Sequence, residues 1–402
     1  MNLRQVAGGV TAPSGFRASG LHCGIKASGK PDLSLIVSDS LASAAGVFTI
    51  NLAKAPPIYV CQDHLASSGG RAIAIVTNSG CANACTGPQG AADAKEMVQL
   101  TASTLGCGND HVLVASTGVI GVNLKMDKLR AGIPQAAAAL DPDGGAAAAR
   151  AIMTTDPFPK ECAVEVTTAS GNFRVGGMAK GSGMIEPRMA TMLGYLTTDA
   201  AADPVMLQRA VAEAVRYTFN AITVDGEPST NDCVLALANG ASGVQITDDL
   251  YPALVEGLRA VAHELALGVV RGGEGATKLI AITVTGASTD SDAWMAARAI
   301  ANSPLVKTAV HGGDPNWGRL VAAAGRSGAG FVLDGARVQI GTLVLFENGR
   351  PFDELAPKAA EYLQGKDLSI AVDLGTGGHF TATVWTCDLS AEYVKINAEY
   401  RT

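Results

Sequence analysis

Short β-branched runs alternate with alanine-rich helical segments along most of the chain, and this alternation constrains the fold more than any other feature. Buried strands are predicted over residues 71–78, 111–117, 195–198, 278–285, 338–346, 368–373 and 379–386. Helices are predicted over residues 90–105, 126–140, 144–153, 205–219, 250–270 and 291–303. Residues 162–168 and 172–178 predict a hairpin around Ser170-Gly171. The pattern as a whole is typical of an α/β architecture.

The composition fits such a fold. The chain has 402 residues, of which 48% are hydrophobic, so it can bury a large core divided over two or three packed units. Its 47 glycines and low aromatic content suit tight turns between strands and helices. Composition alone marks no domain boundary.

The charge balance excludes several classes of partner. The net charge is −7, the pI is about 5.4, and no run of Lys or Arg occurs, so we expect neither nucleic acid nor an anionic membrane as a partner. No apolar stretch approaches the roughly 20 residues of a membrane span. The start of the chain has no apolar segment typical of a signal peptide. We therefore expect a soluble, cytoplasmic protein.

Cysteine and histidine give no sign of a metal site. The eight cysteines are scattered, and Cys81 and Cys85 form the one close pair, with no second pair or histidine at zinc-ligand spacing. The six histidines are not clustered in the sequence. We expect buried structural thiols and no metal in the chemistry.

Clusters of polar residues and glycine lie at or near the ends of the predicted strands, where functional loops of α/β proteins gather. The clusters are residues 77–80 (TNSG), 116–118 (STG), 180–183 (KGSG), 225–232 (DGEPSTND), 273–275 (GEG) and 312–318 (GGDPNWG). The P-loop, the dinucleotide-binding G-x-G-x-x-G motif and the G-x-S-x-G elbow do not occur. We expect these loops to converge on one site.

Residues 180–193 (KGSGMIEPRMATML) suit neither a regular helix nor a strand, because they combine glycine, methionine and a central proline. With the residues that follow, this segment resembles the cleavage and active-site segment of the ornithine acetyltransferase family, also called bifunctional glutamate N-acetyltransferase. Other blocks similar to that family are 9–16, 77–87, 116–121, 152–156, 224–226, 229–232, 273–278, 306–310, 314–319 and 396–402. The resemblance covers essentially the whole chain. Cys81 and Pro157 depart from the family pattern, which leaves local loop geometry open.

The resemblance implies a layered α/β sandwich of the self-processing ornithine acetyltransferase type, with N-terminal-nucleophile chemistry. It implies cleavage between Ala190 and Thr191 into an alpha chain, residues 1–190, and a beta chain, residues 191–402. A C-terminal α/β subdomain would span about residues 275–402. Thr191 would be the nucleophile, and Thr117 and Gly118 would donate hydrogen bonds to the oxyanion.

The implied activity is transfer of acetyl from N-acetylornithine to glutamate through an acetyl-threonine, which gives ornithine and N-acetylglutamate in arginine biosynthesis. Substrate-binding residues would be Thr154, Lys180, Thr191, Glu274, Asn397 and Thr402. No cofactor is implied, and whether acetyl-CoA serves as a second acetyl donor stays open. Family members assemble as a heterotetramer of two alpha and two beta chains, which we expect here.

Two other interpretations stay open at this point. An N-terminal-nucleophile amidohydrolase or aminopeptidase would use the same Thr191 but pass the acyl group to water. An uncleaved amino-acid-binding protein would need no nucleophile, so the joint presence of Thr191, Thr117, Gly118 and Lys180 counts against it.

Overall fold

The computed structural model describes residues 2–186 and 192–399 and divides the chain into two compact units. Unit 1 comprises the described residues of 1–220 and 228–269, and unit 2 comprises residues 221–227 and those from 270 on. Each unit has its own sheet and its own apolar core, so each is presented separately. Residues 192–220 pack within unit 1.

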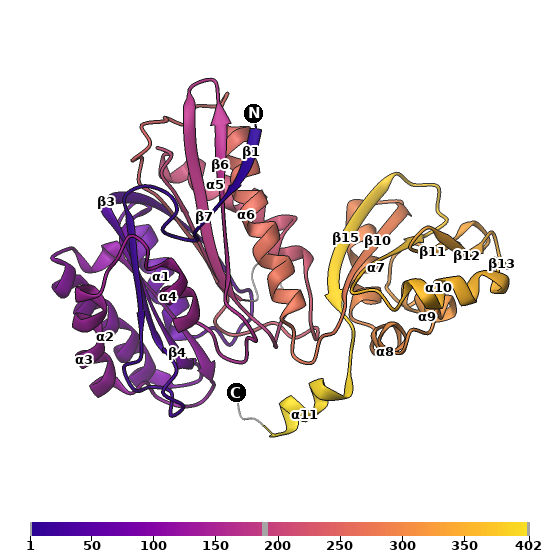
Figure 1. Ribbon diagram of the computed structural model, residues 1–402, viewed down its shortest axis with the longest axis horizontal. Coiled ribbons are helices and arrows are strands. Elements are labelled where there is room, and N and C mark those ends of the chain that lie inside the picture. The colour runs from indigo at the N-terminus through magenta and orange to yellow at the C-terminus, as the bar shows by residue number, and fades with distance from the viewer. Residues whose placement is uncertain (1, 187–191, 400–402) are drawn as a thin grey trace. The chain divides into compact units, whose positions relative to one another are not determined.

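Unit 1 is built on a mixed nine-stranded sheet with the order β1-β6-β7-β8-β9-β3-β4-β5, in which β2 pairs with β3 outside this path (Figure 1). Its strands are β1 (Asn2–Val6), β2 (Phe16–Leu21), β3 (Leu33–Phe48), β4 (Arg71–Cys81), β5 (Val112–Val119), β6 (Lys160–Thr168), β7 (Gly171–Lys180), β8 (Leu193–Thr198) and β9 (Cys233–Ala238). Two neighbouring pairs are parallel, β4 with β5 and β8 with β9. Parallel strands end at the same edge of a sheet, which gathers their terminal residues there.

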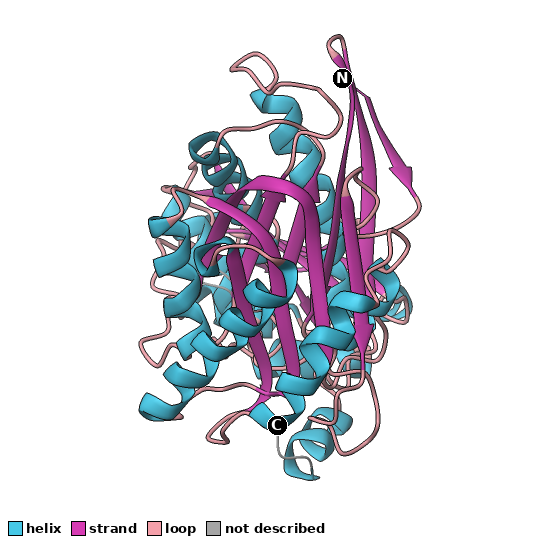
Figure 2. Ribbon diagram, turned by 90° about the vertical axis from the view of Figure 1, so that its left-hand side faces the viewer, coloured by secondary structure: helices cyan, strands magenta, loops and turns pink. Residues whose placement is uncertain are grey.

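Helices pack along the strands of this sheet, as the turned view in Figure 2 shows. They are α1 (Pro56–Ser67), α2 (Gly87–Leu105), α3 (Met126–Ala138), α4 (Gly145–Ala151), α5 (Pro204–Arg216) and α6 (Tyr251–Arg271), whose last turn enters unit 2. Glycines let α6 approach the sheet closely. A Cβ on Gly177 of β7 would lie 2.8 Å from Val261, and one on Gly257 of α6 would lie 2.8 Å from Val166. Among the described residues, no helix is long and apolar enough to cross a membrane.

Unit 2 has a six-stranded sheet with the order β13-β12-β11-β14-β10-β15. Its strands are β10 (Leu279–Ala287), β11 (Arg337–Ile340), β12 (Leu343–Glu347), β13 (Arg350–Pro351), β14 (Asp367–Asp373) and β15 (Phe380–Cys387). Its helices are α7 (Asp290–Ala301), α8 (Pro304–Gly312), α9 (Trp317–Gly325), α10 (Ala356–Tyr362) and α11 (Ala391–Glu399). The segment 221–227 joins this unit through a parallel bridge between Ile222 and Trp385.

The structure confirms the α/β class and most of the predicted elements, including the hairpin of β6 and β7. The prediction of one strand over 338–346 is wrong, because Gly341, with a φ of 60°, turns the chain between β11 and β12. The cysteine prediction is right in that all eight thiols are free, but Cys85 is exposed and Cys23 and Cys107 are half-buried. The polar clusters at 77–80 and 116–118 lie in the last residues of β4 and β5, near the strand ends as expected.

Candidate active site

Thr117 and Gly118 lie at the end of β5 and pair with the end of β4. The parallel register places Ser79 beside Thr117 and Gly80 beside Gly118. A Cβ on Gly118 would lie 2.4 Å from the carbonyl carbon of Gly80, and its φ of 130° favours glycine. Glycine at position 118 is therefore what lets the two strands approach so closely at this edge.

Three buried polar side chains hold the β5 end (residues 116–118) in place. The Ser116 hydroxyl donates to Asn78 Oδ1 at 2.6 Å, and Asn78 Nδ2 donates to the Cys81 carbonyl at 2.9 Å. Asn231 Nδ2 donates to the carbonyls of Ser116, at 2.9 Å, and Ala82, at 2.5 Å. The peptide that carries the Thr117 amide is thus fixed from two sides. Sequence reasoning assigned no role to Asn78, Ser116 or Asn231 individually, although all three lie inside the polar clusters it noted.

Lys180, the last residue of β7, contacts the β5 end directly. Lys180 is 9% exposed, and its Nζ donates to Thr117 Oγ1 at 3.2 Å. This bond uses a lone pair of the hydroxyl oxygen and leaves the Thr117 proton available for another acceptor. A cationic donor on the oxygen also polarises the O–H bond and makes it a better donor.

Asp156 is a buried carboxylate that organises the lysine side of the site. It accepts from Lys160 Nζ at 2.6 Å, from the Gly181 amide at 2.8 Å and from the Thr154 amide at 3.0 Å. Burial alone would raise its pKa, but the charges of Lys180 and Lys160 and these hydrogen bonds outweigh burial and lower the pKa to about 2. The Asp156 carboxylate therefore holds both Thr154, a predicted substrate residue, and Gly181, which follows Lys180.

The surroundings of Lys180 carry an excess of positive charge. Lys26 also acts electrostatically on Lys180 and Asp156, and its own Nζ donates to the carbonyls of Pro31 and Met153, both at 2.7 Å. Burial lowers the pKa of Lys26 to about 8. With three lysines around Asp156, this region is suited to an anionic group such as a substrate carboxylate.

The predicted cleavage residues Ala190 and Thr191 lie outside the described residues, so only their flanks are visible. Leu193, the first residue of β8, pairs with Lys180. The Met192 carbonyl accepts from the Cys233 amide at 3.0 Å. The chain on the C-terminal side of Thr191 is therefore anchored between β7 and β9, next to Lys180.

Asp232, just before β9, is a second buried carboxyl in unit 1. Burial raises its pKa well above the usual range, and its Oδ2 accepts from the Ser229 amide at 3.1 Å. The pKa values of Asp156 and Asp232 are thus shifted in opposite directions, because cations and several donors surround the first and burial dominates at the second.

Two of the other predicted substrate residues, Glu274 and Asn397, belong to unit 2. Glu274 is 6% exposed and accepts from Asn397 Nδ2, on α11, at 2.8 Å. Thr402 lies outside the described residues. The structure therefore brings together Thr117, Gly118, Lys180 and Thr154 in one unit and Glu274 with Asn397 in the other. Convergence of all these residues on a single site stays a prediction.

A hydroxyl donor polarised by a buried lysine, at the shared edge of two parallel strands, is suited to stabilising a developing oxyanion. Among the residues that the structure describes, no three His, Cys, Asp or Glu side chains cluster as metal ligands would. Fold and site together define an α/β protein of the acyl-transfer class.

Comparison with known proteins gives the family. The model of the ArgJ family matches residues 17–402. The "Arginine biosynthesis bifunctional protein ArgJ" of Symbiobacterium thermophilum is 51% identical over 407 residues and is covered in full, as is this chain. The protein of the same name from Synechococcus sp. is 49% identical over 411 residues, with 99% of each chain covered. The chain therefore belongs to the ArgJ family.

Two solved structures are also similar in sequence. Ornithine acetyltransferase complexed with ornithine, from Mycobacterium tuberculosis, is 44% identical and covers 47% of this chain and 100% of its own, with a TM-score of 0.44. The ArgJ crystal structure from Bacillus halodurans is 41% identical and covers 47% of this chain and 98% of its own, with a TM-score of 0.45.

Proposed function

We propose that this enzyme transfers an acetyl group from N-acetylornithine to glutamate through an acetyl ester of Thr191, in arginine biosynthesis. The observation that carries the proposal is the contact of Lys180 with Thr117, which prepares a hydroxyl donor next to the strand that follows Thr191. Membership in the ArgJ family supports the same reaction.

Self-cleavage comes first in this mechanism. The Thr191 hydroxyl oxygen attacks the Ala190 carbonyl carbon, the C–N bond breaks, and the nitrogen takes up a proton to become a free α-amine. Water then hydrolyses the resulting ester, leaving the Ala190 carboxylate and the Thr191 hydroxyl. The new amine has an ordinary pKa of about 7.7–8.0, so it can act as a base near neutral pH. Threonine needs such a base, and its own amine supplies one.

Transfer then proceeds in two halves. The Thr191 oxygen attacks the acetyl carbonyl of N-acetylornithine while the α-amine takes the hydroxyl proton and passes it to the departing nitrogen of ornithine. The α-amine of glutamate next attacks the acetyl ester, and N-acetylglutamate leaves as Thr191 regains its proton. Both tetrahedral intermediates carry an oxyanion, for which the Thr117 hydroxyl and the Gly118 amide are the donors.

Substrate charges match the proposed binding residues. Lys180 has three N–H donors, and its bond to Thr117 leaves others for a substrate carboxylate. Glu274 would bind the cationic side-chain amine of the ornithine moiety. Thr154, Asn397 and Thr402 would complete the substrate contacts.

Acetyl exchange tests the proposal. Wild-type enzyme should move labelled acetyl from N-acetylornithine to glutamate, and omission of glutamate should stop net release of ornithine after one turnover. Continued release of ornithine and free acetate without glutamate would instead establish a hydrolase. Supplying labelled acetyl-CoA in place of N-acetylornithine tests the second donor, for which we propose the same acetyl-threonine.

We also propose that the cleaved protein assembles as two alpha chains, residues 1–190, and two beta chains, residues 191–402. Native mass spectrometry should then give a mass of four chains. A mass corresponding to one alpha and one beta chain would contradict this assembly.

A further inference from the structure

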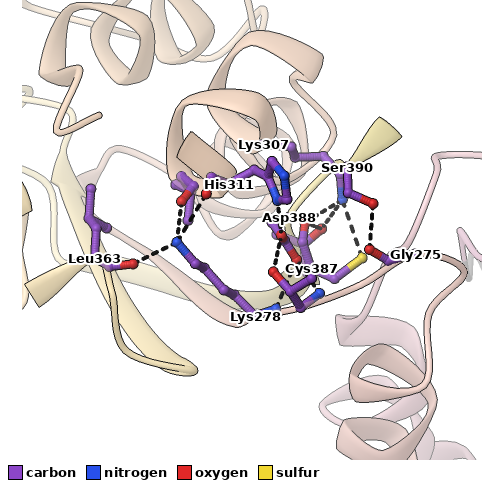
Figure 3. Close-up of polar contacts among 11 residues, drawn as sticks. Gly275, Lys278, Lys307, His311, Leu363, Cys387, Asp388 and Ser390 are labelled. Atoms are coloured by element: carbon purple, nitrogen blue, oxygen red, sulfur yellow. Dashed lines mark hydrogen bonds and ion pairs between the residues drawn. The ribbon is translucent and has the colours of Figure 1, made fainter. Parts of the chain in front are cut away.

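Asp388, just after β15, joins the loop that carries Glu274 to the segment that leads into α11 (Figure 3). Its Oδ1 accepts from the amides of Thr277, at 2.7 Å, and Lys278, at 2.8 Å. Its Oδ2 accepts from the Thr277 hydroxyl at 2.6 Å and contacts His311 Nδ1 at 2.7 Å. The carboxylate therefore makes four polar contacts, three of them with groups of the loop 273–278.

The Asp388 side chain is fully buried, and burial opposes its ionisation. The hydrogen bonds from Thr277, His311 and the two amides outweigh burial and lower its pKa. A charged acceptor that is satisfied in this way is difficult to replace, because a neutral side chain would leave buried donors unpaired. The junction is thus a built feature rather than an incidental surface contact.

Two further contacts strengthen the junction from the α11 side. The Ser390 hydroxyl donates to the Gly275 carbonyl at 2.6 Å. A Cβ on Gly275 would lie 2.5 Å from the Tyr393 amide nitrogen, so the loop lies directly against the first turn of α11. Lys307, which is 3% exposed, donates to the Cys387 carbonyl at 2.6 Å and to the Thr386 hydroxyl at 2.8 Å, which fixes the strand end that precedes Asp388.

Within its described residues, α11 has no buried side chain that could hold it in place. A helix of nine residues is also marginal on its own. Two hydrogen bonds attach its side chains to unit 2: Tyr393 donates to Asp225 at 3.2 Å, and Asn397 donates to Glu274 at 2.8 Å. The position of Asn397 relative to Glu274 consequently depends on how the base of the helix is attached to the loop.

We infer that Asp388 is a positioning residue that fixes Glu274 and Asn397 as a prearranged pair for the cationic amine of the substrate. Asn397 occupies one of the roughly four lone-pair sites of the Glu274 carboxylate and leaves others for an ammonium group. This inference rests on the proposed function, in which Glu274 binds that amine. Asp388 itself acts through the loop and does not touch the substrate.

The test compares two acetyl donors, N-acetylornithine and N-acetylnorvaline, which has the same chain length but lacks the side-chain amine. Asp388→Asn should reduce the preference for N-acetylornithine, measured as the ratio of the two kcat/KM values, by about 10- to 100-fold. Partial unfolding lowers both values together, so it leaves the ratio unchanged. An unchanged ratio in Asp388→Asn would overturn the inference.

Asp373→Asn is the matched control. Asp373 also belongs to unit 2 and accepts from the Thr285 hydroxyl and the Gly375 amide, both at 2.8 Å, but it has no bond to the loop 273–278. It should lose stability without losing the substrate preference. A loss of preference equal to that of Asp388→Asn would also count against a specific role for Asp388.

Glu274→Gln distinguishes a failure of the proposed function from a failure of the inference about Asp388. A wild-type preference in Glu274→Gln would contradict the proposed function, because the amine would then bind elsewhere. Loss of the preference for N-acetylornithine in Glu274→Gln but not in Asp388→Asn would overturn this inference alone.

If Asp388→Asn does not fold, Thr277→Val and Thr277→Ser test the same junction. Thr277→Val should lose the preference for N-acetylornithine, and Thr277→Ser, which keeps the hydroxyl, should retain it. Equal preferences in these two variants would overturn the inference.

Discussion

The β5 end in unit 1 and the Glu274–Asn397 pair in unit 2 are held in place by different means. Thr117 and Gly118 lie inside a sheet, between paired strands, with buried side chains on either side. Asn397 lies on a short helix without a buried residue of its own, attached through hydrogen bonds at its base. The first arrangement depends on strand register and the second on a few polar contacts, so substitutions should affect the two regions differently.

The largest effect on stability should come from Asp156→Asn, which leaves Lys160 buried without its carboxylate partner. Breaking one partner of a buried pair costs about 3–5 kcal/mol of the free energy of unfolding. Denaturant unfolding of the purified variant measures this loss. Asp39→Asn removes an exposed pair with Arg17 and should cost no more than about 1 kcal/mol. Equal losses in the two variants would contradict the buried role of Asp156.

The lowered pKa of Asp156 predicts that the folded protein loses stability at acidic pH. That pKa is lowered from 3.8 to about 2 in the folded protein, so the contribution of Asp156 to stability is complete above about pH 4. That contribution is lost progressively as the pH falls from about 4 towards 2, because the unfolded chain then binds the proton more readily. In Asp156→Asn, the slope of stability against pH over this range should be shallower than in wild type.

Thr117→Val should have the next largest effect. Valine matches the shape of threonine but removes the donor, and loss of one oxyanion donor lowers kcat by about 10²–10³-fold. Steady-state kinetics of acetyl transfer measure the change, and Thr117→Ser, which keeps the hydroxyl, should retain most activity. Comparable activity in the valine and serine variants would exclude Thr117 as a donor.

Asn231→Ala tests whether side chains outside the predicted site hold the β5 end. It leaves the carbonyls of Ala82 and Ser116 without their donor, which should cost about 1–3 kcal/mol of stability and lower kcat by roughly tenfold. Asn239 makes the same kind of contact, with the carbonyls of Ser14 and Gly15, elsewhere in unit 1. Asn239 is half-buried, so Asn239→Ala should lose less stability, and it should keep its kcat; a loss of kcat equal to that of Asn231→Ala would show a general effect.

Asn397→Ala should have the smallest effect on stability and act mainly on substrate binding. We expect KM for N-acetylornithine to rise by about tenfold, with the free energy of unfolding changed by less than about 0.5 kcal/mol. Val394→Ala, on an exposed position of the same helix, should leave KM unchanged. Full activity after deletion of residues 397–402 would contradict any role for this end of the chain.

Local sequence predicted the elements whose pattern is strong. The β-branched runs of β4 and β5 and the periodicity of helices α2 and α6 predict these elements from the sequence alone. The long strand β3 escaped prediction because it is rich in serine and alanine and its pairing shifts register between Val37 and Ala42. β9 (CVLALA) was missed for a related reason, since such a short apolar run fits a strand or a buried helix equally well.

For the candidate site, family resemblance supplied Thr117, Gly118 and Lys180, and the structure adds how they are held. The roles of Asp156, Asn231 and Asp388 depend on contacts between residues far apart in sequence, such as that of Asn231 with Ala82. No local pattern encodes such a contact, because it exists only once the chain has folded.

The most direct test of the proposed mechanism is the intact mass of the purified protein under denaturing conditions, measured beside Thr191→Ala. Self-processing at Thr191 predicts two fragments for the wild type, residues 1–190 and 191–402, and one uncut chain for the variant. A single uncut chain of 40.8 kDa in both samples would contradict it, because Thr191 would then lack the α-amine that serves as its base.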